Sequence, residues 1–170
     1  SDVYKRQLRC RLDEPKNREL ASAFAPRFII DSSIRSKSLR GEAAKRGKSI
    51  LVYEAGEALR LNTAPVQAGI EGTIRLMHYL GMRSDSAPPK QTSIIIKKSS
   101  WVRARYAGMF RTQVSIGQKV VKNQVLGSVS DPYGEFEKTV KSPAEGYLIA
   151  INHQPVVNQG DALIHVGIEG

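Results

Sequence analysis

Three residues that could take part in hydrolysis lie close together at positions 54, 56 and 57. Glu54 follows the short apolar run Ile50–Tyr53, and Gly56 and Glu57 come soon after it. In an open α/β sheet the reactive groups lie at strand ends, where a glutamate can take a proton from a metal-bound water. Gly56 would let the backbone approach a substrate, and Glu57 is either the reacting group itself or a partner of it. The pattern predicts a metal-assisted hydrolase with Glu54 as its acid/base residue; the simpler alternative is a glutamate that points into solvent.

Alternating helices and strands must hold these residues in place. Pro15 suits the first turn of a helix, Ser38 is a suitable N-cap, and Gly47 and Gly81 are suitable helix ends. The pattern predicts, in order, a helix at 17–24, a strand at 27–30, a helix at 38–47, a strand at 49–53 and a helix at 62–81. We therefore expect residues 8–83 to be part of an α/β domain with a mostly parallel sheet.

The last of these helices carries an apolar stripe and two glycines. We predict that the stripe packs on the sheet, because its members recur at helical spacing: Val66, Ile70, Ile74, Met77 and Leu80. Gly69 and Gly72 each cost about 1 kcal/mol of helix propensity relative to alanine. We therefore expect these glycines to allow close packing against a neighbouring element.

A strand-rich segment follows. Residues 84–92 contain proline, serine and aspartate without periodicity, and we predict that they form a linker. In residues 93–170, short β-prone runs alternate with turn residues, which predicts a small all-β domain. Within it, Lys119–Val129 resembles Pro155–Val166, which favours two related hairpins packed face to face.

Charge and composition restrict the partners. The chain of 170 residues has a net charge of +10, but its Lys and Arg residues are spread along it without interleaved aromatic residues. This favours a small anionic substrate over nucleic acid.

No apolar run is long enough to span a bilayer and no secretory signal opens the sequence, so no membrane partner is predicted. The single cysteine, Cys10, cannot form an intramolecular disulfide and agrees with a cytoplasmic location. The sequence leaves homo-oligomer formation open.

The first seven residues differ in kind from the rest. Ser1–Gln7 resembles the translated linker sequence met at the ends of fragmentary reading frames. We therefore expect residues 1–7 to be non-native, leave them out of the predicted fold, and expect the natural chain to begin upstream of Leu8.

Several segments together carry a family resemblance that covers nearly everything from Leu8 onward. The segments are Leu12–Pro15, Ala23–Phe24, Ser38–Gly41, Ile50–Arg60, Tyr79–Met82, Trp101–Ala104, Gly117–Gly127, Asp131–Gly134 and Val156–Leu163. In combination they resemble the succinylglutamate desuccinylase/aspartoacylase family, relatives of the zinc carboxypeptidases. The resemblance implies a C-terminal fragment of a zinc-dependent hydrolase that cleaves the amide bond of an N-acyl amino acid.

The resemblance also implies roles for particular residues. Glu54 stands where the family glutamate activates the zinc-bound water and later protonates the leaving amine. Arg40 matches the arginine that holds a substrate carboxylate, although a surface arginine at a helix start is an equal alternative. The family binds zinc through a His-x-x-Glu pair and a later histidine, which precede the region matched here. Because His78, His153 and His165 lack that spacing, we predict no metal ligand in residues 1–170 and no activity of the fragment alone.

The β-rich segment has a second resemblance, to the biotinyl/lipoyl domains of barrel-sandwich type. Those domains carry their cofactor on a lysine at a hairpin tip. We expect the tip near Gly134-Glu135, where no lysine stands, and Lys138 is the nearest. We therefore predict a structural role for this segment; a non-catalytic binding or carrier module is the alternative function.

Overall fold

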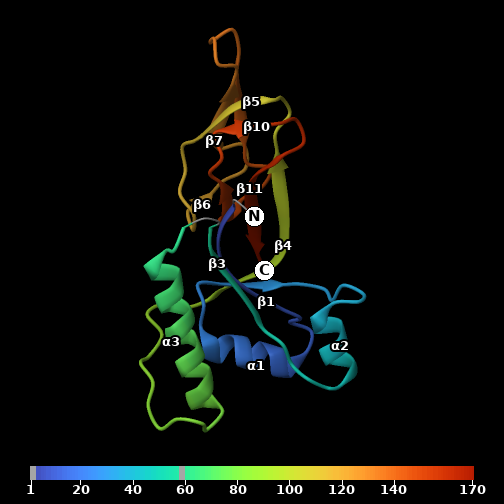
Figure 1. The fold of residues 1–170 in the computed structure, drawn as a ribbon, viewed down its shortest axis with the longest axis vertical. Coiled ribbons are helices and arrows are strands. Elements are labelled where there is room, and N and C mark those ends of the chain that lie inside the picture. The colour runs from blue at the N-terminus through green and yellow to red at the C-terminus, as the bar shows by residue number, and fades with distance from the viewer. Residues whose placement is uncertain (1–2, 58–59) are drawn as a thin grey trace. The chain divides into compact units, whose positions relative to one another are not determined.

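A computed structural model describes residues 3–57 and 60–170, with side chains described from Gln7 onward (Figure 1). Residues 1–2 of the linker-like sequence and residues 58–59 of the segment after Glu57 lie outside the described residues. The chain forms two compact units. We call them the helical unit (residues 6–56 and 61–96) and the strand unit (residues 97–170 with residues 3–5, 57 and 60). The helical unit ends at residue 96 and the strand unit resumes at residue 97, a few residues after the predicted linker at 84–92.

The helical unit contains every helix and strand predicted for residues 8–83. Its elements are β1 (Val3–Cys10), α1 (Pro15–Phe24), β2 (Phe28–Asp31), α2 (Leu39–Lys45), β3 (Val52–Gly56), α3 (Thr63–Tyr79) and the start of β4 (Ile94–Arg103). The strand order is β3-β1-β2-β4, with β1–β2 and β2–β4 parallel. Helix α3 packs beside α1 and β3 (Figure 1).

Local sequence decides where the helices begin and end. Pro15 lies in the first turn of α1, where its missing N–H is not needed, and Ala25 ends α1 in the left-handed region at φ 52°. The Ser38 hydroxyl caps α2 by accepting a hydrogen bond from the Gly41 amide at 3.1 Å. Gly81, at φ 72°, lies just after α3, as predicted.

One hydrophobic cluster of the helical unit lies on the face of β1 that carries Leu8 and Cys10. Leu8 and Cys10 are fully buried on one side of β1, and because side chains alternate along a strand, Gln7 and Arg9 point to the other side. The core residues are Leu8, Cys10, Leu12, Ala21, Phe24 and Ile29, with Leu51, Tyr53 and Ile95 packed against them. The opposite face carries Gln7 and Arg9 together with three buried apolar side chains, since Arg9 pairs with Ile30 and Ile30 with Ile96: Phe28, Ile30 and Ile96.

The apolar stripe on α3 does not pack on the sheet, so that prediction is wrong. Two of its members are each 49 % exposed: Val66 and Ile70. The buried side carries the two glycines instead. A Cβ added at Gly72 would lie 2.4 Å from Phe24 Cε1, and one added at Gly69 would lie 2.9 Å from Tyr53 Cε1. The predicted reason for the glycines is confirmed, because these rings can approach the helix so closely only where it has no side chain.

No helix in the described part of the chain is long and apolar enough to cross a membrane.

The bounds of two strands differ from the predicted ones. β1 begins at Val3, so residues 3–7, which the prediction left out of the fold, take part in it, and Gln7 is only 2 % exposed. β3 runs from Val52 to Gly56, so Glu54 lies in the middle of the strand and not after its end. The prediction ended the strand at Tyr53, the last residue of the apolar run. The strand continues to Gly56, where the backbone turns at φ 86°.

The strand unit is built from two sheets. Besides the rest of β4 it contains β5 (Gly108–Thr112), β6 (Lys119–Val120), β7 (Val125–Ser130), β8 (Glu137–Lys141), β9 (Gly146–Asn152), β10 (Val156–Val157) and β11 (Ala162–Glu169). The orders are β4-β11-β9-β6 and β10-β5-β7-β8, and the start of β1 pairs antiparallel with β9. In the helical unit the pairs β1–β2 and β2–β4 are parallel, as predicted for residues 8–83, whereas the pairs within the strand unit are antiparallel. The fold as a whole is therefore mixed α/β. A barrel-sandwich arrangement of residues 93–170 stays a prediction.

The sequence repeat in the strand unit is also a structural repeat. Each copy has a two-residue strand, a turn and a longer strand: β6 and β7 in one copy, β10 and β11 in the other. The two strands of a copy lie in different sheets, so the copies are not the hairpins that the sequence predicted. Matching positions are Asn123 and Gly160 (φ 65° and 92°), Gln124 and Asp161, and Leu126 and Leu163 (both 0 % exposed). The Gln124 and Asp161 side chains each accept a backbone N–H from three residues earlier, at 3.0 and 2.7 Å. Both copies contribute to one core, which holds Phe110, Val120, Leu126, Leu148, Val157 and Leu163 among others.

Candidate functional site

Glu54 lies on β3, next to β1 in the sheet of the helical unit. Gln7 Nε2 donates a hydrogen bond to Glu54 Oε2 at 2.6 Å, and Arg9 Nη1 lies 3.8 Å from the same oxygen. The side chains of Arg9 and Glu54 are 33 % and 30 % exposed. Both contacts restrain the same carboxylate oxygen. Glu54 is therefore an oriented carboxylate that is still partly exposed to solvent.

A second set of contacts joins Arg9 to Arg40 through Ser32, which follows β2. Ser32 Oγ accepts hydrogen bonds from Arg9 Nη2 at 3.2 Å and from Arg40 Nη2 at 3.1 Å. Arg40, near the start of α2, also donates to the backbone carbonyls of Ser32 and Ser33 at 3.3 and 3.2 Å. One continuous series of polar contacts results, which we call the Arg9 network: Gln7, Glu54, Arg9, Ser32 and Arg40.

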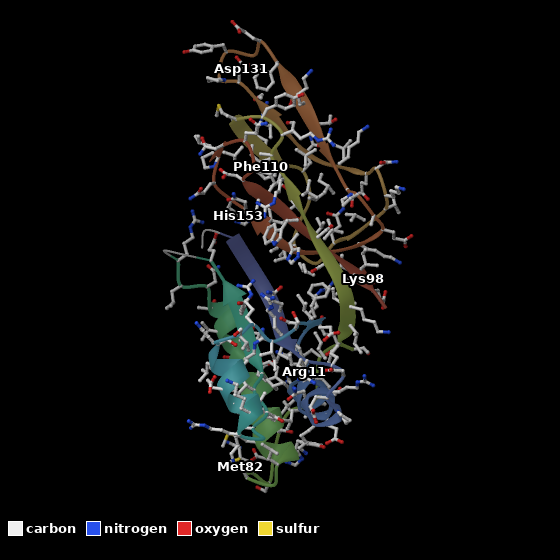
Figure 2. All side chains as sticks on the ribbon, turned by 90° about the vertical axis from the view of Figure 1, so that its right-hand side faces the viewer. Arg11, Met82, Lys98, Phe110, Asp131 and His153 are labelled. Carbon is white, nitrogen blue, oxygen red and sulfur yellow. The ribbon has the colours of Figure 1, made fainter. Side chains whose placement is uncertain are left out.

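The other two predicted site residues have different surroundings. At Gly56 an added Cβ would meet nothing within 4 Å, so its φ of 86°, and not a lack of space, requires glycine. Glu57 belongs to the strand unit, where its Oε2 lies 3.2 Å from Nδ1 of His153, a residue labelled in Figure 2. The structure thus brings Glu54 and Arg40 into one network and pairs Glu57 with a histidine. The roles assigned to all four residues stay predictions.

The described residues do not fit a zinc site. Among them, no group of three or more His, Cys, Asp and Glu side chains is placed to hold a metal ion. His78 Nδ1 lies 3.1 Å from the Arg83 carbonyl oxygen, and the His165 ring stacks on Trp101 with the ring centroids 4.4 Å apart. These contacts give both histidines structural surroundings, so we derive no catalytic step through a metal held by this part of the chain.

The β7–β8 hairpin contains the position at which a carrier domain would present its lysine. Ser130 pairs with Glu137, so the tip comprises residues 131–136, which include the predicted position at 134–135. The Asp131 carboxylate, labelled in Figure 2, closes this turn by accepting the backbone N–H groups of Phe136 at 2.9 Å and Tyr133 at 3.1 Å. The tip sequence has no lysine, and Lys138 already lies within β8. This geometry gives the carrier alternative no attachment residue.

Sequence reasoning did not identify three members of the Arg9 network. Gln7 belongs to the linker-like residues 1–7, and Arg9 and Ser32 match no catalytic motif. One signal was available: Gln7 and Arg9 alternate with Leu8 and Cys10, as the polar face of a half-buried strand does. The partner of that face, Glu54, is 47 positions from Gln7, and only the sheet brings the two together.

Solved structures share this fold. The chain matches the succinylglutamate desuccinylase/aspartoacylase from Rhodobacter sphaeroides with a TM-score of 0.86 at 16 % identity, over 100 % of this chain and 56 % of that one. The ectoine utilization protein EutE (DoeB) from Ruegeria pomeroyi matches with a TM-score of 0.86 at 14 % identity, over 98 % of this chain and 56 % of that one. A succinylglutamate desuccinylase/aspartoacylase family protein from Shewanella amazonensis SB2B has a TM-score of 0.75 at 20 % identity, over 96 % and 51 %.

The chain spans about half the length of these solved structures. No protein-family model matches the sequence, and no curated protein is found as a relative. At 14 to 20 % identity the likeness is one of fold. The resemblance expected from the sequence motifs is confirmed at that level: this chain has the fold of about half of a succinylglutamate desuccinylase/aspartoacylase family structure.

Proposed function

We propose that this chain is part of a zinc-dependent hydrolase that cleaves the amide bond of an N-acyl amino acid. The observation that carries the proposal is that Glu54 and Arg40 belong to one polar network, in a chain with this fold. A carboxylate and a guanidinium are the two groups that hydrolysis of an acylated amino acid needs: one to move a proton and one to hold the substrate carboxylate.

In the proposed reaction Glu54 acts as general base and then as general acid. Its carboxylate accepts a proton from the attacking water and later gives that proton to the nitrogen of the leaving amine. Gln7 and Arg9 both contact Oε2, so they fix the orientation of the carboxylate.

Arg40 binds the carboxylate of the amino-acid part of the substrate. Its planar guanidinium can form two parallel hydrogen bonds to a carboxylate, which orients the amide bond with respect to Glu54. The chain does not choose among acyl groups, so succinyl, acetyl and other acyl groups all belong to the proposed substrate class. Gly56, two residues beyond Glu54 on β3, is proposed to border the same substrate. The substrate-binding role expected for Glu57 stays a prediction.

Zinc is proposed because of the family resemblance, with ligands outside these 170 residues. When bound, it would supply a Lewis acid for the scissile carbonyl. No group of described residues fits it, so the role assigned to this chain is confined to proton transfer and substrate binding.

The test uses a longer form of the protein that joins this chain to the remaining half of the fold, loaded with zinc. Glu54→Gln should lower kcat/KM toward a panel of N-acyl amino acids by roughly a thousandfold, the range of general acid–base catalysis, while zinc content stays unchanged. Glu19→Gln, at an exposed glutamate on α1, is the matched control and should keep full activity. Full activity of Glu54→Gln would refute the proposal, and loss of zinc from that variant would make Glu54 a ligand.

A further inference from the structure

The structure gives Arg9 a place between the two groups on which the proposed reaction depends. Gln7 and Arg9 point to the same side of β1, opposite to the buried Leu8 and Cys10. That side faces Glu54 on β3, and it also reaches Ser32 at the end of β2. The position of Arg9 is therefore set by strand register and not by an adaptable loop.

The Arg9 guanidinium contacts Glu54 and Ser32 at the same time. Its Nη1 lies 3.8 Å from Glu54 Oε2, and its Nη2 donates to Ser32 Oγ at 3.2 Å. Because a guanidinium is planar and rigid, these two contacts fix the distance between their partners. A lysine has one charged nitrogen on a flexible stem and could not fix that distance in the same way.

Ser32 extends this connection to Arg40. The hydroxyl is in a buried residue, 7 % exposed, and accepts from both arginines at 3.2 and 3.1 Å. A hydroxyl oxygen has two lone pairs, so it can accept both hydrogen bonds. The acid/base residue and the substrate-binding arginine are thus joined by one arginine and one serine.

The Arg9 network has features that stability alone would not favour. It places two guanidinium groups on one hydroxyl with one carboxylate nearby. In addition, Arg9 Nε and Gln7 Oε1 are buried without a hydrogen-bond partner among the described residues. Buried polar atoms left in this state, and like charges placed together, cost free energy. Features of this kind are typical of functional sites.

We propose that Arg9 is a positioning residue: it holds the Glu54 carboxylate at a fixed separation from Arg40. The proposal rests on the proposed function for its catalytic meaning. Its structural content, the coupling of Arg9 to Glu54, can be measured without any activity.

The experiment records the NMR signal of the Glu54 carboxyl carbon at neutral pH in the 170-residue chain labelled with ¹³C-glutamate, with Glu54→Gln to assign the signal. Arg9→Met should move this signal, because the guanidinium that lies 3.8 Å from Glu54 Oε2 is lost. Arg11→Met is the matched control. Arg11, labelled in Figure 2, lies two positions further on and pairs with Asp13 at 2.9 Å, so this variant should leave the signal unchanged.

A second pair of variants covers the case in which Arg9→Met fails to fold. Arg9→Lys and Arg11→Lys keep the charge and change only the geometry. Arg9→Lys should accelerate hydrogen exchange of the Arg40 guanidinium, because the shared position of Ser32 is disturbed, and Arg11→Lys should not. Equal behaviour of the position 9 and position 11 variants in both measurements would overturn the proposal.

The outcome separates this proposal from the proposed function. If the longer, zinc-loaded form hydrolyses N-acyl amino acids, Arg9→Met should lower kcat by roughly tenfold or more with little change in KM, because the substrate contact of Arg40 remains. If the wild-type longer form has no such activity, the proposed function fails, while the NMR signal of Glu54 still decides whether Arg9 positions it.

Discussion

At the scale of single residues, the positions that matter most are those where a side chain or its absence decides a contact. Glu54 has its place because Gln7 and Arg9 meet it from the neighbouring strand, and Tyr53 has its place because Gly69 lets the ring approach α3. Tyr53 Oη also donates to the Pro65 carbonyl at 2.9 Å. Tyr53 and Glu54 are adjacent on β3, yet Tyr53 is held by contacts with α3 and Glu54 by contacts with β1.

Replacement of Gly72 by alanine should destabilise the chain, although alanine is the better helix former. The new Cβ would meet Phe24 Cε1 at 2.4 Å, and the Phe24 ring, which is 6 % exposed, has little room to move. We expect a loss of about 1–3 kcal/mol in the free energy of unfolding measured with urea. Thr73→Ala, at the next and exposed position, should change it by less than about 0.5 kcal/mol. Greater stability of Gly72→Ala would show that the two elements are not so closely packed.

At the scale of elements, the end of α1 is a place where the sequence is not optimal for the fold. Ala25 adopts φ 52° and ψ 58°, a left-handed conformation that suits glycine better than alanine. Arg75 on α3 donates to the Phe24 carbonyl at 3.2 and 3.0 Å, so α3 helps to complete the end of α1. The hydrogen bonds from Arg75 to the Phe24 carbonyl therefore help to stabilise a helix end at which Ala25 has an unfavourable backbone conformation.

Replacement of Ala25 by glycine should therefore stabilise the chain by about 0.5–1 kcal/mol, because the strain of the left-handed conformation is removed. The same substitution two positions earlier, Ala23→Gly, should destabilise it by about 1 kcal/mol, since it introduces glycine into the helix itself. Thermal unfolding of the two variants measures the opposite signs. A loss of stability with Ala25→Gly would contradict the assigned conformation.

At the scale of the whole molecule, the single cysteine reports on the core of the helical unit. Cys10 is fully buried, and burial, with a further contribution from the Asp31 carboxylate, raises the pKa of its thiol from 9.0 to about 11. Because the folded state has the higher pKa, this group contributes its stability fully below pH 9 and loses it as the pH rises toward 11.

A thiol reagent at pH 8 should therefore label Cys10 in the folded chain at least about a hundredfold more slowly than in the chain unfolded with denaturant. The reason is that both the thiolate fraction and access to the sulfur are reduced. Mass spectrometry of the labelled chain measures the two rates, and Cys10→Ser is the control that should take up no label. Rapid labelling under native conditions would mean that the helical unit is not a stable core in this chain.

Much of the secondary structure could be predicted because its signals are local. Pro15, Ser38 and Gly81 mark helix boundaries through their own backbone chemistry, and the structure places the helices accordingly. The repeat in the strand unit was likewise readable, because each copy uses the same turn: a residue with positive φ followed by a side chain that accepts a backbone N–H. The family resemblance, built from many short segments, predicted the fold.

The packing faces and the candidate site could not be predicted to the same degree. The five apolar residues of α3 form a regular stripe, yet the buried side of that helix is the one on which Gly69 and Gly72 meet aromatic rings. Periodicity identifies an apolar face but does not say which face a neighbour will approach most closely. The end of β3 was misplaced for a similar reason, since hydrogen bonding to β1 and the turn at Gly56 decide it.

The sequence by itself determined the helices and strands, the repeat, the likeness to the succinylglutamate desuccinylase/aspartoacylase fold and the choice of Glu54 and Arg40 as candidate residues. Only the tertiary structure decided what surrounds them. Arg9 and Ser32 carry no motif, and they join Glu54 to Arg40 because strand pairing brings β1, β2 and β3 together. Such contacts between residues far apart in the chain depend on sheet register, which a local pattern does not contain.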